Sequence, residues 1–465
     1  MQTTLKLPIT NVYAKGDYCA TLHIGSERSP VNLIIDSGSS TLVVKEASYQ
    51  ASKDNHLTPT TIAQEVNYGI GGWNGPVIHT SISIYDDSYT ENSAKANKPS
   101  ITLENATIAL VSSKTQYATF GLADGMLGMA YHHLNKGFNL SDYLQEQKVA
   151  PAHTYPWPFL ENCLQNNLPD SDDLKQFKHF LWQYPEHDIT PYFTELALHN
   201  LSTNKFSFYS KRSAIHVGEN HVPQSTTEQL TPKQLAPKQL TPEQLKQDPL
   251  NQGWLILGGG EEQTDLYQGD FSSIRVEHDV YYNVELTSVQ VGNKTSIAAA
   301  PLDNKHLKSY LTNAIIDTGA GGIVLTAEIY QQVISDLIAV NSDFADQLKP
   351  FTELSAQEVG IDANELNLAQ WPDITFTFVG DSTINKESNS KETNNIKQTV
   401  QLTCAPQTYW QVNTPKFGKA CFRLLSQLPQ WPNQSIIGLP LLNNYYVIFD
   451  RSVETTGVIK FAQQI

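Results

Sequence analysis

Residues 33–44 read Leu-Ile-Ile-Asp-Ser-Gly-Ser-Ser-Thr-Leu-Val-Val, and residues 314–325 read Ala-Ile-Ile-Asp-Thr-Gly-Ala-Gly-Gly-Ile-Val-Leu. Each stretch is an apolar, β-branched run followed by Asp, a hydroxyl residue and Gly, and then by small residues and a second apolar run. The apolar runs are typical of buried strands, and the Gly-containing centre predicts a sharp turn between them. The chain therefore carries one strand–turn–strand unit twice.

Each unit places an aspartate in its turn, Asp36 in the first and Asp317 in the second. A carboxylate is costly to bury alone, so each needs a charged, polar or functional partner. The simplest arrangement makes the two aspartates partners of each other at a pseudo-twofold axis. Two carboxyls a few ångströms apart share one proton, because like charges at that distance do not both ionise. The pattern therefore predicts acid–base chemistry.

The length and charge of the chain limit its class. Its 465 residues exceed what one hydrophobic core usually organises, so two core units are expected. Hydrophobic residues make up 40% and aromatic residues 10%, which suits a β-rich globular protein. Lys and Arg number 31 against 47 Asp and Glu, giving a net charge of −16. This balance argues against nucleic acid as a partner, because neutralising phosphates requires clustered basic residues.

The sequence also predicts where the protein works. Residues 1–8 lack a basic segment followed by a long apolar core, so no signal peptide is expected. No apolar run approaches the ~20 residues of a membrane-spanning helix. The four cysteines are too few for a disulfide scaffold; Cys404 and Cys421 could face each other across a hairpin, but a reduced pair is at least as consistent with a chain lacking an export signal. We expect a cytoplasmic monomer with no membrane partner.

Strand patterns dominate the chain. Residues 11–45 predict three strands, so the strand pattern begins near residue 11, and residues 66–77 predict a hairpin with a glycine-rich tip. This hairpin misses the G-x-G-x-x-G spacing of a phosphate loop, and no helix follows it. Residues 139–200 are expected to be helical. Within them, helical spacing after Ser171-Asp172-Asp173 is seen at Leu174, Phe177, Phe180 and Leu181.

The duplicated turns, with glycine-terminated runs at 127–128 and 437–438, indicate two related halves. We expect an N-terminal lobe of residues 1–205 and a C-terminal lobe of residues 206–465. Two polar inserts in the second lobe, about 211–252 and 381–398, are expected to be flexible. Part of the first insert, residues 228–246, repeats Gln-Leu-(Thr/Ala)-Pro-(Lys/Glu). Proline at every fifth residue blocks regular helix and ladder pairing, so this part predicts an extended or disordered loop.

These features together resemble the pepsin-like aspartic peptidases, and among them the bacterial pepsin homologues of the shewasin type. Asp36-Ser37-Gly38 and Asp317-Thr318-Gly319 resemble the two active-site signatures of that family, and Tyr68-Gly69-Ile70-Gly71 resembles its flap. Two Asp-x-Gly triplets in apolar frames, a flap and further blocks in family order make the resemblance specific. The further blocks are residues 124–130, 191–196, 206–209, 436–438 and 445–451. Residues 211–252, 381–398 and much of 132–188 lie outside it.

The resemblance implies an all-β fold with minor helices, in which two pseudo-twofold-related, β-barrel-like lobes flank a deep cleft. It implies an aspartic endopeptidase that acts on peptides or proteins at acidic pH. A water between Asp36 and Asp317 would be the nucleophile, with no metal, cofactor or covalent acyl-enzyme. Since no blocking segment is expected before the first lobe, activity without zymogen processing is predicted.

Supporting roles follow from the same resemblance. Gly38 and Gly319 would let the two turns approach closely. Ser37 and Thr318 would support the aspartates, and Ser39 is expected to hydrogen-bond to Asp36 and hold it. The flap residues are expected to close over the substrate, pair with its extended backbone and exclude water. These flap residues are Tyr68, Gly69 and Ile70.

Three positions depart from the family pattern. Ser37 replaces the more usual Thr and keeps the hydroxyl. Ala320 stands where many acid-acting relatives carry a hydroxyl, so the ionised form of Asp317 should be less favoured and the pH optimum less acidic. Val43 stands where pepsins carry a Trp that supports the flap Tyr; Trp73 at the flap tip is expected either to compensate or simply to shield the cleft.

Other classes fit less well. A peptide-binding module with the same fold but weak or no catalysis is the main alternative, although such proteins usually lose an Asp or a neighbouring Gly that this chain retains. A two-carboxylate glycosidase shares the acid–base logic but does not explain the duplicated turns or the flap. A metal hydrolase would need a motif such as His-Glu-x-x-His, and a serine hydrolase would need Gly-x-Ser-x-Gly; neither occurs.

Overall fold

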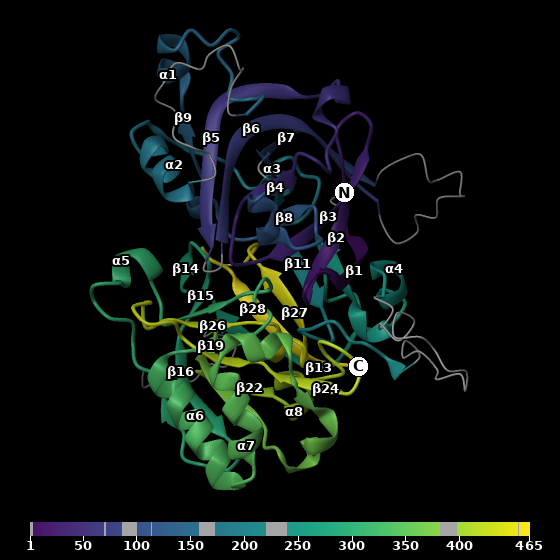
Figure 1. Cartoon of the computed structure of the whole chain (residues 1–465), viewed down its shortest axis with the longest axis vertical. Coiled ribbons are helices and arrows are strands. Elements are labelled where there is room, and N and C mark those ends of the chain that lie inside the picture. Colours follow the sequence, from purple (N-terminus) through teal and green to yellow (C-terminus); the bar gives the residue numbers. More distant parts are fainter. Residues whose placement is uncertain are drawn as a thin grey trace, which may run out of the picture.

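The structure is a computed structural model of the whole chain, and it shows two lobes built mainly of strands (Figure 1). The N-terminal lobe lies in the upper half of Figure 1 and the C-terminal lobe in the lower half. The mostly-β, bilobal fold predicted from the sequence is thus confirmed. The structure describes residues 3–68, 71–85, 100–112, 114–157, 173–219, 240–381, 398–453 and 455–465, without the side chains of Tyr68 and Leu354.

One long sheet runs through the N-terminal lobe and continues into the C-terminal lobe. Its middle strands bring the first and last parts of the chain together, because β1 pairs with β12 and β11 pairs with both β12 and β27. In spatial order the strands are β10 (Glu186–Asp188), β9 (Lys136–Asn139), β5 (Thr58–Tyr68), β6 (Gly71–Ile84), β7 (Ile101–Val111), β4 (Leu42–Lys45), β8 (Gly125–Gly128), β3 (Ser29–Asp36), β2 (Asp17–Ile24), β1 (Leu5–Ala14), β12 (Gln252–Leu257), β11 (Lys205–Tyr209), β27 (Tyr445–Asp450), β28 (Val458–Gln464) and β13 (Tyr267–Arg275).

The C-terminal lobe adds smaller sheets. In spatial order, the strands of one sheet are β14 (His278–Asp279), β15 (Tyr282–Val284), β18 (Ala314–Ile316), β26 (Ser435–Ile437), β19 (Ile323–Leu325) and β25 (Leu424–Ser426). Another runs β17 (Ile297–Ala298), β16 (Leu286–Val291), β21 (Ile374–Val379), β22 (Thr399–Cys404), and a third runs β20 (Ile361–Asp362), β24 (Lys419–Phe422), β23 (Trp410–Val412).

The α-helices are short apart from α6, and most lie on the outside of the lobes (Figure 1). They are α1 (Ser141–Glu146), α2 (Leu174–Leu181), α3 (Tyr192–Leu198), α4 (Pro242–Leu245), α5 (Leu307–Tyr310), α6 (Ala327–Val340), α7 (Phe344–Leu348), α8 (Pro406–Tyr409) and α9 (Leu439–Leu442). Among the described residues, no helix is long and apolar enough to cross a membrane.

The two Asp-containing units fold alike. In the N-terminal lobe β3 pairs in parallel with β8, and β8 pairs antiparallel with β4, which follows the turn after β3. In the C-terminal lobe β18 pairs in parallel with β26, and β26 pairs antiparallel with β19, which follows the turn after β18. The repeated sequence therefore gives a repeated strand pattern, with each Asp turn at the end of a buried strand.

The expectation that the strand pattern begins near residue 11 is wrong, because β1 starts at Leu5. Leu5, Leu7 and Ile9 alternate into the core, as the two-residue period of a strand requires. Pro8 lies within this strand, between Leu7 and Ile9. It is tolerated because pairing with β2 begins only at Ile9, so the missing amide lies where β1 pairs on one side alone.

Helix predictions met with mixed results. The expectation that residues 139–200 are helical is confirmed at α1, α2 and α3 and is wrong at β10, which is a strand. The helix expected after Asp173 is α2, and the Asp173 side chain caps it by accepting a hydrogen bond from the amide of Gln176. The loop predicted for residues 228–246 is wrong at its end, where a proline at the first helical position of α4 and a Thr241–Gln244 capping box allow one short helix. Residues 220–239 lie outside the described part of the chain. Helix α6, with Ile329, Val333 and Leu337 on its buried face, was not predicted.

The other segments named as inserts can be described in part. Residues 211–219 and 240–252 contain buried side chains, among them Arg212, Ser213 and Asn251. Asn251 donates hydrogen bonds to the carbonyls of His216 and Leu245, so it ties the two ends of the insert together. Most of the second insert, residues 382–397, lies outside the described residues. The expected lobe boundary, between residues 205 and 206, falls within β11.

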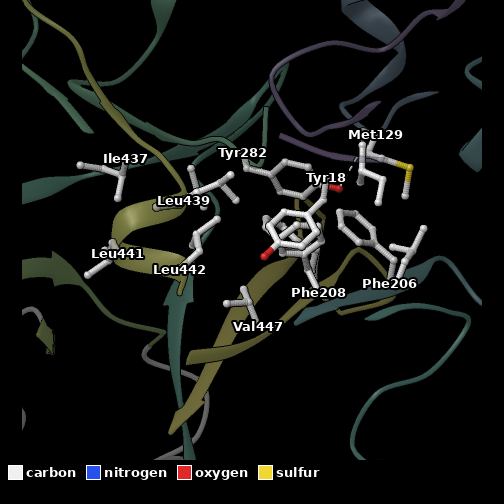
Figure 2. Packing of buried hydrophobic residues seen from close by; sticks show 14 of the residues in the cluster. Tyr18, Met129, Phe206, Phe208, Tyr282, Ile437, Leu439, Leu441, Leu442 and Val447 are labelled. Carbon is white, nitrogen blue, oxygen red and sulfur yellow. Dashed lines mark hydrogen bonds between the residues drawn. The ribbon is translucent and has the colours of Figure 1, made fainter. Parts of the chain in front are cut away.

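A common core joins the lobes. Figure 2 shows Tyr18 and Met129 from the N-terminal lobe close to Phe206, Phe208 and Tyr282. The Tyr282 hydroxyl donates a 3.1 Å hydrogen bond to the carbonyl of Met129. The guanidinium of Arg451, from the end of β27, lies 4.0 Å from the ring centre of Tyr131 and donates to the Tyr282 hydroxyl. These contacts fix the floor on which the two Asp turns meet.

Candidate active site

The two Asp turns have matching local geometry. The amide of Gly38 donates a 2.8 Å hydrogen bond to Oδ1 of Asp36, and the amide of Gly319 donates a 2.8 Å hydrogen bond to Oδ1 of Asp317. Each bond closes a short loop between residue i and residue i+2, so each carboxyl is oriented by its own turn. The Asp-x-Gly triplets recognised in the sequence therefore present their carboxyls in equivalent ways.

The middle residues of the two triplets cross-link the turns. The amide of Ser37 donates a 3.0 Å hydrogen bond to Oγ1 of Thr318, and the amide of Thr318 donates a 2.9 Å bond to Oγ of Ser37. Each hydroxyl then donates to a strand of the opposite lobe, Ser37 to the carbonyl of Ile316 and Thr318 to the carbonyl of Ile35. Ser37 and Thr318 are fully buried, so these bonds do not compete with water. The network fixes the distance between the two turns.

The glycines mark where the opposite carboxyl lies. A Cβ added at Gly38 would stand 2.6 Å from Oδ2 of Asp317, and one added at Gly319 would stand 2.5 Å from Oδ1 of Asp36. Both distances are far below van der Waals contact, so no side chain fits at either position. Each carboxyl therefore rests against the glycine of the other turn, and the two acids are neighbours across the lobe interface.

This proximity perturbs both acids. Burial raises the pKa of Asp36, against hydrogen bonds from Ser39 and Gly38 that lower it. Burial and then the negative charge of Asp36 hold the pKa of Asp317 well above its ordinary value, against one hydrogen bond from the amide of Gly319. A hydrogen bond between the carboxyls lowers the pKa of Asp36 and raises that of Asp317. Both shifts favour a carboxyl pair that holds one shared proton.

The asymmetry has a simple origin in the sequence. Ser39 supplies a hydroxyl to Asp36, whereas the corresponding residue of the second turn, Ala320, has none. Ser39 is buried, and its hydroxyl also lies 3.2 Å from the sulfur of Met126. A hydrogen bond to a carboxylate favours its ionised form, so the lobe with Ser39 carries the more acidic member of the pair.

A third carboxyl, Asp17 at the start of β2, lies in the same groove and was not predicted. Burial and then the charge of Asp36 raise the pKa of Asp17 from 3.8 to about 8, while Arg423 opposes the shift. A single Asp before an ordinary strand is no signal by itself. Asp17 matters because β2 pairs with β3, the strand that ends at Asp36, and this pairing brings the start of β2 next to the Asp36 turn.

The acids stand in a groove of about 740 Å³ between the lobes. The first lobe contributes residues of the flap strand β5, and the second contributes Tyr281, Tyr310 and the segment 430–432. Trp431 of that segment is 40% exposed, so the groove has an apolar patch at its mouth. A groove of this volume, lined by residues of both lobes, has room for a peptide segment.

The flap is described up to its tip. Strands β5 and β6 form an antiparallel hairpin in which Tyr68 pairs with Gly71. The predicted flap residues Gly69 and Ile70 lie outside the described residues, as does the side chain of Tyr68. The structure thus brings the hairpin to the groove, while the expected contacts of these three residues with substrate stay predictions.

Of the two expectations for Trp73, shielding of the cleft is wrong, because the side chain is not exposed. Trp73 is fully buried on β6, opposite Val66 of β5. It packs in one apolar cluster with Val43 and Met126 beneath the hairpin. Val43 is small and leaves space in this cluster. The indole of Trp73, which comes from the flap strand β6, fills that space.

The cysteines lie apart from this groove. Cys404 and Cys421 are buried free thiols, as is Cys19. The Cys404 thiol donates to the carbonyl of Pro440, and the Cys421 thiol donates to the carbonyl of Gln357. The possibility of a bridge between Cys404 and Cys421 is therefore not realised; Cys163 lies outside the described residues.

The sequence model of the family described as eukaryotic aspartyl protease matches residues 190–464 of this chain. The match covers more than half of the sequence and includes Asp317, Gly319 and the central strands β11 and β27. Asp36 and the flap precede the matched region, and the Asp36 turn repeats the strand pattern of the Asp317 turn within it. The chain belongs to the eukaryotic aspartyl protease family.

Proposed function

We propose that this protein is an aspartic endopeptidase in which Asp36 and Asp317 together activate one water molecule. The observation that carries the proposal is the mutual packing of each carboxyl against the glycine of the other turn, 2.5–2.6 Å from where a Cβ would stand. Two acids held this close at the floor of a peptide-sized groove form a dyad that shares a proton. Family membership supports hydrolysis of peptide bonds as the reaction.

The hydroxyl of Ser39, which Asp36 has and Asp317 lacks, suggests a role for each acid. Asp36, ionised with the help of Ser39 and Gly38, takes a proton from the water as it attacks the scissile carbonyl carbon. Asp317, protonated, donates its proton to the carbonyl oxygen, and a tetrahedral diol results. Transfer of the proton from Asp36 to the amide nitrogen, and return of a diol proton to Asp317, break the C–N bond and restore the starting state.

The surroundings suit this chemistry. Cross-linking by Ser37 and Thr318 holds both acids in place without substrate, so little reorganisation is needed during the reaction. The hairpin β5–β6 lies along the groove and would cover an extended peptide, pairing with its backbone and excluding water. We expect the flap residues Tyr68, Gly69 and Ile70 to make those contacts.

We also propose a subtype within the family and a cellular compartment for this protein. We infer the bacterial shewasin type from the family-ordered blocks around Asp36, the flap and Asp317. Free buried thiols at Cys19, Cys404 and Cys421 suit the reducing cytoplasm, where we expect a monomer to act. We also propose activity without proteolytic processing, since among the described residues none before Asp17 lines the groove.

Cleavage of peptides tests the proposal. Wild type and Asp36→Ala would be assayed on a mixed peptide library from about pH 3 to pH 7, with and without pepstatin, a transition-state mimic of this reaction. We expect wild type to cleave internal bonds at acidic pH, pepstatin to inhibit it, and the variant to be inactive. Binding of peptides by wild type without any cleavage would instead establish the peptide-binding module.

A further inference from the structure

The described parts of one insert cover the outer edge of the flap hairpin. The insert comprises residues 136–188, of which 136–157 and 173–188 are described, and it lies outside the family match. Its strand β9 pairs with β5 at Ile62 and Ala63, and its strand β10 pairs with β9. The flap strand β5 therefore has β9 on one side and β6 on the other. Figure 1 shows α2 of this insert lying next to β5.

An apolar cluster fastens this insert to the flap. Ala63 of β5 packs with side chains of β9, α1 and α2 that are buried together and separate from the main core. On α2 these are Phe177, Phe180 and Leu181. These three side chains are buried against the flap strand. Lys178, which follows Phe177 on the helix, lies at the edge of the cluster and lines the groove.

Lys178 makes an ion pair with the flap strand there. Its Nζ lies 3.3 Å from Oε1 of Glu65, and the two side chains are 30% and 8% exposed. The other carboxylate oxygen of Glu65 accepts a 2.6 Å hydrogen bond from the side chain of Asn67. The Lys178 ammonium also lies 4.8 Å from the ring centre of Trp182, which limits its freedom. The chain of contacts thus runs from helix α2 to the residue before Tyr68.

The same three residues line the groove that holds the aspartates. Lys178, Glu65 and Asn67 all belong to its wall, with Asp36 and Asp317 at its floor. A largely buried carboxylate is costly to leave without its cation, so Glu65 resists any movement of β5 that would separate it from Lys178. The ion pair is therefore placed to hold the flap strand at one distance from the floor.

We propose that Lys178 is a positioning residue for the flap: through Glu65 it ties β5 to the insert and orders the flap before substrate binds. This inference rests on the proposed peptidase function. Ordering a flap in advance lowers the entropy that substrate binding must overcome, so it strengthens binding without touching the reacting groups. Loss of the tie should raise KM and leave kcat nearly unchanged.

The experiment compares Lys178→Met with wild type, and uses Lys175→Met as a matched control, because Lys175 is an exposed lysine on the same helix. Amide hydrogen exchange is measured over Thr58–Tyr68, and kcat and KM are measured on one peptide substrate. We expect Lys178→Met to speed exchange in this strand and to raise KM, each by about fivefold, the order of one partly buried ion pair, with kcat within about twofold. Lys178→Arg should restore both, and Lys175→Met should change neither.

The outcomes separate this proposal from the proposed function. Unchanged exchange with unchanged KM overturns the tie, and faster exchange with unchanged KM overturns its role in substrate binding. A wild-type protein that cleaves no peptide contradicts the peptidase function, and exchange alone then decides whether the tie exists. If Lys178→Met does not fold, Glu65→Gln removes the same ion pair from the flap side and carries the same expectations.

Discussion

The amide of Ser37 donates a hydrogen bond to the hydroxyl of Thr318, and the amide of Thr318 returns one to the hydroxyl of Ser37. These two residues come from opposite lobes, and each occupies the middle of an Asp-x-Gly triplet. Since both are fully buried, the reciprocal pair acts as a dry cross-link at the lobe interface. The cross-link therefore helps to set the separation of the two carboxyls.

Removing one hydroxyl from the cross-link should destabilise the protein and slow catalysis. Thr318→Val keeps the shape but leaves the amide of Ser37 and the carbonyl of Ile35 without a partner, which costs about 1 to 3 kcal/mol in free energy of unfolding. Urea unfolding measures this loss, and kcat should fall as the carboxyls move. Thr318→Ser, which keeps the hydroxyl, serves as the control. Equal stability of Thr318→Val and wild type would show that the cross-link contributes nothing.

Adding one methyl group at Gly319 should disable the pair. The new Cβ would stand 2.5 Å from Oδ1 of Asp36, so one of the two turns must move. A displacement of about 1 Å between reacting groups lowers kcat by roughly 100-fold. Gly38→Ala should behave alike, because its Cβ meets Asp317 in the same way. Full activity in either alanine variant, with an unchanged circular dichroism spectrum, would rule out close contact between the acids.

A hydroxyl at position 320 should lower the pH optimum of the enzyme. Ala320→Thr gives Asp317 a hydrogen-bond donor like the one Ser39 gives Asp36, and this lowers the raised pKa of Asp317. Asp317 must be protonated to act, so activity is lost as pH rises through the upper pKa of the dyad. The alkaline limb of the kcat/KM profile should therefore move to lower pH. A limb that stays in place would refute this explanation of the asymmetry.

Asp17 should limit stability at neutral pH. Because its pKa in the folded protein is raised to about 8 from 3.8, the folded state holds a proton that the unfolded state releases, and stability falls as pH rises through this window. Asp17→Asn removes that loss. Its free energy of unfolding should equal that of wild type near pH 4 and exceed it by about 1 to 3 kcal/mol near pH 7, allowing for partial exposure of the carboxyl.

Thermal or urea unfolding at the two pH values measures the Asp17→Asn difference. Asp270→Asn, which neutralises an exposed carboxylate on β13, is the control and should show no such trend. A stabilisation by Asp17→Asn that is the same at both pH values would mean that burial of charge is not its cause.

The local patterns of the sequence were sufficient for the parts of the fold that repeat. Asp36 and Asp317 sit in nearly identical frames, so their strands, their turns and the role of their glycines could be read from one another. The helix α2 was also predictable, because its apolar residues follow one helical face after an Asp cap. In these places the local sequence and the tertiary structure favour the same conformation.

Features that depend on distant contacts could not be read in the same way. Asp17 becomes significant only when β2 is laid beside the Asp36 turn, and Lys178 only when α2 packs on the flap strand. Trp73 was assigned to the flap tip, since its sequence does not reveal that β6 turns this side chain inward onto Val43. The start of β1 at Leu5 was missed; a strand that contains Pro8 needs an unpaired edge there, and the sequence does not tell which edge is paired.

The most direct test of the shared water is a double-mutant cycle on the two acids. Asp36→Asn, Asp317→Asn and the double variant are compared with wild type by kcat on one fluorogenic peptide, after circular dichroism has verified that all four are folded. If both carboxyls act on the same water, each single variant loses nearly all activity and the double variant is no worse than either one. Substantial cleavage by either single variant, or losses that multiply in the double variant, would contradict a dyad.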